Sequence, residues 1–116
     1  MLNKTNRLKK RKEFNFIFKR GSVAHSSMFT IHHAKALKSV PQIGISVSKQ
    51  VGNSVVRSRV KRIISEAFRH IVDSVVVRNY VVSAKEAIKD KKSNEVEQEL
   101  VKVLRKNGLF KEEKDV

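Results

Sequence analysis

The sequence has no cysteine and no tryptophan, and only one proline among its 116 residues. Without cysteine, disulfides and thiolate chemistry are excluded, which fits a reducing cytoplasm. No apolar run approaches the roughly 20 residues that a membrane-spanning helix needs. The segment Met1–Lys4 also lacks the apolar stretch of a secretory signal. We therefore expect a cytoplasmic protein without a membrane partner.

Acidic residues are scarce in the first 70 residues, which hold only Glu13 and Glu66 against 16 Lys and Arg. The rest of the chain holds nine acids against ten cations, so nearly all of the net charge of +15 lies in the first part. Folding does not need such one-sided charge, and its self-repulsion opposes compaction. We expect a polyanionic partner, with nucleic acid favoured over an acidic membrane surface.

Hydrophobic residues make up 40% of the chain, enough for one packed domain of modest size. We expect a single domain over residues 1–116, with flexible tails at residues 1–7 and 111–116 and a basic, extended arm over residues 3–12. The periodic segments follow the order helix, strand, strand, helix, strand, helix. This order indicates an α+β fold in which the helices pack on one small sheet.

Three helices are predicted from apolar residues at helical spacing. The first covers about residues 12–20 and ends at Gly21. The second follows a turn at Asn53 and continues to Ile71, with the most regular pattern in the chain. The third begins with a capping pair formed by Asn94 and Glu97, and it ends at Asn107-Gly108.

Three segments are predicted to be strands. Ser22–His33 is interpreted as one strand, and Ile43–Ser48 alternates strictly, with its isoleucines and valine directed inward. Arg78-Asn79 interrupts the pattern before the third strand, Tyr80–Ala84. Lys85–Lys92 is predicted to be a polar connection.

The basic segment Asn53–Arg69 has two distinct faces when placed on a helical wheel. The apolar face carries Val56, Val60, Ile63, Ala67 and Ile71. The opposite face carries Ser58, Lys61, Arg62, Ser65 and Arg69, with Arg57 and Arg59 on the flanks. A solvated helix face normally places acids near its cations, yet Glu66 is the only acid between Lys49 and Ile71. We therefore expect this face to bind RNA or DNA, because arginine and helix N-termini suit phosphate.

The first predicted helix carries Phe14, Phe16 and Phe18 among several cations. Aromatic rings interleaved with cations are typical of proteins that bind single-stranded nucleic acid. Helical spacing alone favours a different role for Phe14, Ile17 and Phe18, namely the hydrophobic core. Phe16 lies off that stripe and fits neither interpretation.

The residues of the chain indicate no catalytic centre. His32 and His33 alternate along a strand and cannot reach one metal ion together, and a metal-dependent nuclease would need several acidic ligands. No phosphate-binding loop, serine elbow or zinc ligand set is present. We expect no catalytic residue, no metal bound by the protein and no organic cofactor.

The run Gly44–Arg62, GISVSKQVGNSVVRSRVKR, closely resembles the signature of the bacterial ribonuclease P protein subunit. In that family a strand ending in S-x-K leads through V-G-N-A-V into a helix with R-N-R-x-K-R. Residues 7–21 resemble the N-terminal part of the family, residues 80–85 its last strand and residues 104–110 its closing helix and tail. The similarity extends from about Arg7 to Phe110.

The resemblance implies a protein that serves as the non-catalytic subunit of an endoribonuclease. Its RNA partner, the ribonuclease P RNA, removes the 5′ leader from precursor tRNA with Mg²⁺, while the protein binds both RNAs and requires no protein partner. The family fold is a four-stranded sheet with three helices. The resemblance also implies a left-handed β-α-β crossover around the basic helix, where general rules would expect a right-handed one.

The basic face and the resemblance together assign residues to two sites. The predicted contacts to the catalytic RNA are Asn53, Arg57, Ser58, Arg59, Lys61, Arg62 and Arg69. The predicted cleft for the leader is lined by Phe14, Phe18, Lys19, His32 and Lys49, an assignment that reverses the core interpretation of the phenylalanines. Ser58 and Ser65 depart from the family, which usually has asparagine and arginine there, and His32 or Ile31 stands where an aromatic residue is usual.

Two other interpretations are compatible with the composition. A structural RNA-binding protein of the small ribosomal type would share the charge, but it does not predict the run Val51–Arg62. A self-sufficient nuclease would cleave RNA without an RNA partner.

Overall fold

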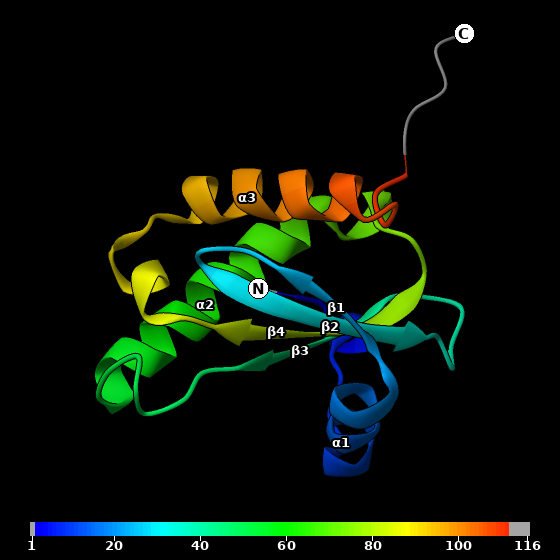
Figure 1. Ribbon diagram of the computed structural model, residues 1–116, viewed down its shortest axis with the longest axis horizontal. Coiled ribbons are helices and arrows are strands. Elements are labelled where there is room, and N and C mark those ends of the chain that lie inside the picture. Colours follow the sequence, from blue (N-terminus) through cyan, green and yellow to red (C-terminus); the bar gives the residue numbers. More distant parts are fainter. Residues whose placement is uncertain (1, 112–116) are drawn as a thin grey trace, which may run out of the picture.

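A four-stranded mixed sheet with the order β1-β2-β4-β3 runs through the centre of the structure (Figure 1). The computed structural model describes residues 2–111. The strands are β1 (Ser22–His25), β2 (Phe29–Lys35), β3 (Gln42–Ser46) and β4 (Arg78–Ala84). The β1-β2 and β2-β4 pairs are antiparallel, whereas β3 pairs in parallel with β4. A parallel neighbour requires a long crossover, which here contains a helix.

Three α-helices cover the two faces of the sheet unequally (Figure 1). Helices α2 (Ser54–Ile71) and α3 (Ser93–Lys106) pack on one face, and α1 (Arg11–Arg20) covers part of the other. Short 3₁₀ turns lie at η1 (Lys4–Asn6), η2 (Val72–Ser74) and η3 (Glu86–Asp90). The predicted α+β fold with four strands and three helices is confirmed. Within residues 2–111, no helix is long and apolar enough to span a bilayer.

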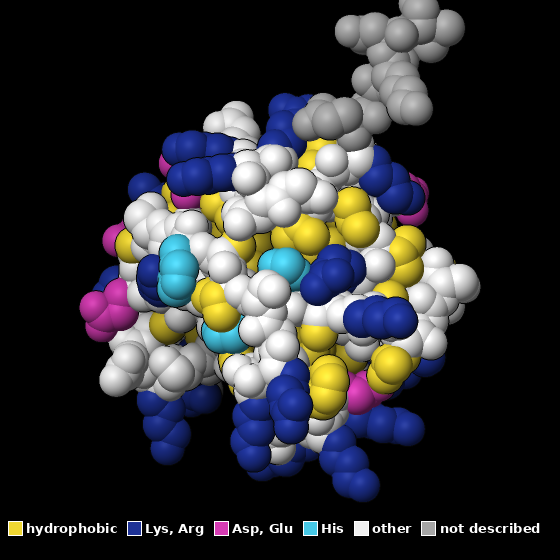
Figure 2. Space-filling view, turned by 45° about the vertical axis from the view of Figure 1, so that its right-hand side comes forward, with side chains coloured by type: hydrophobic (Ala, Val, Ile, Leu, Met, Phe, Trp, Pro, Cys, Tyr) yellow, Lys and Arg dark blue, Asp and Glu magenta, His cyan; other side chains and the backbone are white. Residues whose placement is uncertain are grey.

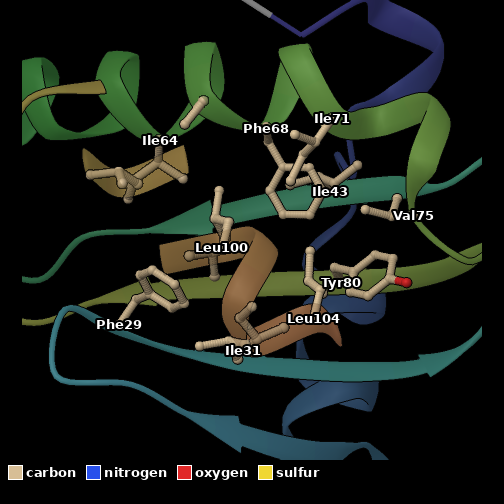
Figure 3. Packing of buried hydrophobic residues seen from close by; sticks show 14 of the residues in the cluster. Phe29, Ile31, Ile43, Ile64, Phe68, Ile71, Val75, Tyr80, Leu100 and Leu104 are labelled. Atoms are coloured by element: carbon tan, nitrogen blue, oxygen red, sulfur yellow. The ribbon is translucent and has the colours of Figure 1, made fainter. Parts of the chain in front are cut away.

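The main hydrophobic core fills the space between the sheet and the helices α2 and α3 (Figure 3). Its largest fully buried side chains include Phe29, Phe68 and Tyr80. The hydroxyl of Tyr80 donates a hydrogen bond of 2.6 Å to the Val76 carbonyl, so its burial leaves no unpaired donor. Phe68 completes the apolar face of α2, although the helical wheel did not include it.

The segment Ser22–His33 forms a hairpin, so the prediction of one strand there is wrong. Two serines turn the chain between β1 and β2. The Ser26 amide donates to the Phe29 carbonyl at 2.9 Å, and the Ser26 hydroxyl accepts from the Met28 amide at 3.1 Å. A serine side chain that hydrogen-bonds to the backbone two residues further along stabilises a turn. Ser26 therefore marks the boundary between β1 and β2 that the sequence analysis did not predict.

Helix α2 begins where the sequence predicts it. The Asn53 Oδ1 atom accepts a hydrogen bond from the Val56 amide at 3.0 Å and caps the helix. Ser65 lies on the same side of α2 as Lys61, as predicted, but it is not exposed there. Ser65 is only 4% exposed, because the N-terminal segment covers it and the Leu2 amide donates to its hydroxyl at 3.0 Å.

Residues 2–7 pack against the domain, although the sequence predicts a flexible tail and an extended arm there. Leu2 and Asn6 are buried, and Arg7 forms a parallel bridge with Ile43 of the edge strand β3. The Leu8 amide continues this pairing with a bond of 3.0 Å to the Ile43 carbonyl. Of the second predicted tail, residues 111–116, only Lys111 lies within the described residues.

The N-cap of helix α3 is Lys92, two residues before the predicted Asn94. The Glu95 carboxylate accepts from the Lys92 amide at 3.0 Å, so Glu95 caps the helix where Glu97 was expected to. The end at Asn107-Gly108 is confirmed, with Gly108 in the left-handed conformation at φ 71°.

Two further predictions in this part of the chain are corrected. Arg78-Asn79 continues β4 instead of interrupting it. Residues 85–92, predicted to be a polar connection, contain η3, whose Ile88 is fully buried in the core.

Replacement of Gly21 by alanine should destabilise the protein. A Cβ at this position would lie 2.5 Å from the Ile17 carbonyl oxygen and 2.7 Å from the His33 carbonyl oxygen. Both neighbours are backbone atoms, so the steric clash can be removed only if α1 moves away from β2. We expect Gly21→Ala to lower the free energy of unfolding by about 1–3 kcal/mol, measured by urea denaturation.

Gly108→Asn is the matched control, because open space surrounds Gly108 and asparagine tolerates its positive φ. This variant should lose less than about 1 kcal/mol. Equal losses at the two positions would show that the contact at Gly21 does not limit α1 packing.

Candidate nucleic-acid interface

The face of the sheet below α1 has an apolar row and a polar row side by side. Ile17 of α1 packs on Ala34 and Val81, forming a small second core. One row further along the strands, Thr30, Ser83 and Ser46 pair across β2, β4 and β3 and are only half-buried. Helix α1 therefore leaves a polar strip of the sheet accessible.

The ring of Phe14 lies directly on the backbone of Gly44 in β3. A Cβ at residue 44 would overlap the ring, with only 2.6 Å to Cε1. The glycine thus allows the aromatic side chain to approach the edge strand closely. This contact places α1 against the edge strand β3, the strand that precedes α2 in the chain.

Phe18 and His32 form an edge-to-face aromatic pair, with ring centroids 4.8 Å apart. Phe18 is 40% exposed, so part of its ring is available to a ligand. Burial lowers the pKa of His32, and the nearby His25 lowers it further. The His32 ring is therefore neutral at pH 7 and can contact a base without its own charge.

Two hollows share the ring of Phe14 in their linings, and together they are here called the central groove. The first has a volume of about 460 Å³ and is lined by Lys9, Arg11, Phe14, Asn15, Phe18 and Ser46. The second has a volume of about 240 Å³ and extends across β3 to α2, where Lys61 and Ser65 line it together with Arg7 and Phe14. The two hollows together extend from the aromatic side of α1 to the cationic helix α2.

The structure brings together only part of the predicted leader cleft. Phe14 and Phe18 line the central groove, and His32 supports Phe18 from the sheet. Lys19 and Lys49 are exposed, but they do not line either hollow.

Sequence reasoning missed Lys9, Arg11, Asn15 and Ser46 as groove residues. Helical spacing could have found two of these, because Arg11 precedes Phe14 by three residues and Phe18 by seven, and Asn15 follows Arg11 by four. Ser46 could be found only from the topology of the sheet.

The first turns of α2 present the predicted cations in two different ways. Arg57 donates from Nε to the Gly52 carbonyl at 3.2 Å, and Arg59 donates to the Lys89 carbonyl at the end of η3. Backbone acceptors therefore hold both guanidinium groups without neutralising them.

Among the described residues, Lys61 and Arg62 have no ion-pair or hydrogen-bond partner. Ser58 is exposed between them and Asn53.

Arg69 is set apart from the other predicted RNA contacts. It lies about two turns beyond Arg62, and its guanidinium binds the carboxylate of Glu66. The hydrogen bonds from Arg69 are the largest cause that lowers the pKa of Glu66 to about 2. His70 joins this cluster and contacts Glu97 of α3 at 2.7 Å. The charge of Arg69 is therefore balanced inside the protein.

The surface that carries α1 is dominated by cations. Figure 2 shows Lys and Arg side chains gathered along the lower part of this face, interspersed with hydrophobic side chains and few acids. Within residues 2–111, no group of three or more His, Asp or Glu side chains could hold a metal ion. The side chains of His32 and His33 lie on opposite faces of the sheet, as predicted.

Comparison with known proteins gives a consistent result. The family model described as Ribonuclease P matches residues 2–108. A ribonuclease P protein component from Clostridium botulinum (strain 657 / Type Ba4) is 35% identical over 109 residues, which cover 92% of this chain and 98% of that protein. Its counterpart from Clostridium novyi (strain NT) is 38% identical over 112 residues, covering 94% and 99%. The solved structure of a Staphylococcus aureus RNase P protein mutant with defective mRNA degradation activity has a TM-score of 0.80 at 31% identity, covering 92% of each chain.

The free energy of unfolding should fall as the pH drops below about 6.5. Burial is the main cause that lowers the pKa of both His32 and His33 in the folded state. The unfolded chain therefore takes up protons first on acidification, and stability present above the ordinary histidine pKa is lost below it. Urea denaturation at pH about 7.5 and about 5.5 measures the effect.

The variants His32→Gln and His33→Gln test the cause of this loss. Each should reduce the difference between the two pH values, because glutamine does not titrate. An unchanged pH difference in both variants would assign the loss to other groups.

Proposed function

The chain belongs to the bacterial ribonuclease P protein family, and from this premise we propose that it binds the catalytic RNA of ribonuclease P and the 5′ leader of precursor tRNA. In this role it assists the RNA-catalysed, Mg²⁺-dependent removal of the leader, which gives the mature 5′ end of the tRNA. The protein acts as the non-catalytic subunit of the endoribonuclease, in the cytoplasm, and needs no protein partner.

The position of Phe14 between the aromatic hollow and the hollow that reaches Lys61 of α2 is the observation that carries this proposal. Phe14 and Phe18 offer partly exposed rings at one end, and Lys61 stands at the other. A single RNA strand in this groove would lie beside the face that carries Arg62. Such an arrangement suits a protein that holds a substrate strand against a larger RNA.

The leader would bind in the groove mainly through stacking and charge. Base–aromatic stacking contributes about 1–3 kcal/mol per base and tolerates different sequences. Lys9 and Arg11 line the same hollow as the rings and can contact phosphate oxygens. Asn15 and Ser46 add polar groups that can bond sugar or base edges. The groove would therefore accept leaders of varied sequence.

The catalytic RNA would bind the first turns of α2. Arg57 and Arg59 are held by backbone carbonyls, so less side-chain entropy is lost when they bind phosphate. Lys61 and Arg62 add cations with no internal partner among the described residues. In our proposal Asn53 and Ser58 extend this surface, and Arg69 lies at its margin because Glu66 binds it.

The proposal leaves the chemistry to the RNA. A phosphodiester hydrolase that works through Mg²⁺ needs several hard oxygen ligands, and the described residues offer no such acidic group around the groove. Mg²⁺ would therefore be held by RNA. The contribution of the protein is to reduce phosphate repulsion between the two RNAs and to hold the substrate strand.

A structural RNA-binding protein without a role in cleavage is the alternative. It would use the same cations, and it would not distinguish a precursor with a leader from mature tRNA. The family membership favours the first proposal, and a cleavage assay separates the two.

Purified protein should stimulate a bacterial ribonuclease P RNA at low Mg²⁺, yet should not cleave precursor tRNA alone. The cations of α2 would replace part of the metal-ion screening that the RNA needs. The measurement is the rate of leader release, with and without the RNA. Cleavage by the protein alone, or no stimulation of the RNA, would contradict the proposal.

The double variant Lys61→Ala, Arg62→Ala should weaken binding to the catalytic RNA and reduce its salt dependence. Each lost phosphate contact lowers the slope of log K against log salt by about 0.7–0.9, so two contacts should lower it by roughly 1.5. Lys102→Ala on α3 is the matched control, because it removes an exposed cation from the nearly neutral part of the chain. Equal changes in slope for both variants would show that α2 is not the phosphate-binding face.

A further inference from the structure

A separate hollow lies on the side of α1 opposite the central groove. It has a volume of about 210 Å³, and its apolar lining includes Phe16, Ile17, Ala34 and Leu37. Phe16 projects from α1 on the side opposite Phe14 and Phe18, because successive helical residues are rotated by about 100°. This hollow, here called the outer pocket, shares none of the residues that line the central groove.

The outer pocket is bordered by two large hydrophobic side chains that the core does not use. Phe16 is 58% exposed and Leu37 is 75% exposed. Single exposed hydrophobic residues are common on protein surfaces. Here an aromatic and an aliphatic side chain border the same apolar hollow, which gives it two accessible walls.

A buried amide without a hydrogen-bond partner also lines the outer pocket. Asn79 is 3% exposed, and its Oδ1 atom has no partner; within residues 2–111 only His32 Nδ1 shares this condition. An unsatisfied buried polar atom costs about 1–3 kcal/mol. Asn79 pairs with Ala34 of β2 and Gln42 of β3 in the row of the sheet beyond Val81, on the side that α1 covers. The walls of the pocket are therefore apolar, and this oxygen is too buried for a ligand to reach.

The charge around the outer pocket suits an anionic chain. Lys12 and Lys35 contribute two cations to its lining, against one acid, Glu13. A peptide with an apolar side chain would use the walls, but it would not need the cations.

We propose that the outer pocket binds one base of a single-stranded RNA segment, separately from the central groove. The base would stack on Phe16, with Leu37 at its edge, and the flanking phosphates would contact Lys12 and Lys35. The volume is below the roughly 300–1,000 Å³ of pockets for drug-sized ligands, and a single ring system needs less space. The site adds a second contact to RNA beyond the one that the proposed function requires.

Stacking gives the pocket a preference among bases. Sequence preferences at stacking sites follow stacking strength more than hydrogen bonding. Adenine has a larger ring system than uracil and covers more of the Phe16 ring. We therefore expect adenine to bind more tightly than uracil.

The absence of tryptophan from the sequence provides a direct test. Phe16→Trp places a single indole in the outer pocket at an exposed position, so the fold should tolerate it. A short oligoadenylate should quench its fluorescence in a saturable way, because the base stacks on the indole. Gln98→Trp is the matched control, since it places the indole on an exposed position of α3, on the other face of the sheet.

Three outcomes decide the proposal. Quenching in Phe16→Trp but not in Gln98→Trp, with oligoadenylate binding more tightly than oligouridylate, supports it. Equal quenching by an abasic strand with the same number of phosphates would show that the phosphates alone cause the quenching. That result would overturn the proposal. Equal affinities for oligoadenylate and oligouridylate would overturn the stacking preference expected at Phe16.

A second pair of variants tests the pocket without an introduced tryptophan. In the otherwise unchanged protein, Phe16→Ala and Leu37→Ala should each weaken oligoadenylate binding, Phe16→Ala by about fivefold or more. Both side chains are exposed, so circular dichroism should show an intact fold. Unchanged affinity in both variants would overturn the proposal. Because these residues lie outside the central groove, leader cleavage with the catalytic RNA reports separately on the proposed function.

Discussion

The contact between the ring of Phe14 and the bare backbone of Gly44 sets how closely α1 approaches the sheet. Most of what α1 presents to solvent depends on that distance. With the ring seated on β3, Ile17 reaches the small second core and Phe18 reaches His32. The same placement leaves a polar strip of the sheet uncovered beside the helix. A larger residue at position 44 would move the helix and alter both hollows beside it.

A second constraint is that α2 must bury one face while the chain carries a net charge of +15. The core occupies the apolar face, so the cations gather on the remaining surface, where few acids balance them. The structure limits the resulting repulsion in part, because backbone carbonyls accept from Arg57 and Arg59 and Glu66 binds Arg69. On α2, Lys61 and Arg62 stay without a partner among the described residues, and Lys61 lines the groove. Binding an RNA would relieve their repulsion.

Much of this arrangement could be predicted from sequence, for reasons that differ between elements. Helix α2 has both a capping residue and a regular apolar stripe, two local signals that agree, so its start at Asn53 and its cationic face were predicted correctly. The burial of Ser65 was not, because a distant segment at Leu2 covers it. The hairpin at Ser26 was not predicted, because Ser22–His33 was interpreted as one continuous strand. The unsatisfied Asn79 and the groove residue Ser46 depend on strand order, which local patterns do not contain.

The pairing of the N-terminal segment with β3 has a consequence for self-association. An edge strand exposes unpaired amide and carbonyl groups that can recruit a strand from another molecule. Residues 7 and 8 occupy part of this edge at Ile43, 35 residues away in sequence. Local unfolding of this segment would free the edge of β3 and remove the wall that Leu2, Arg7 and Leu8 give the groove. Protection from aggregation and the shape of the groove therefore depend on the same short stretch of chain.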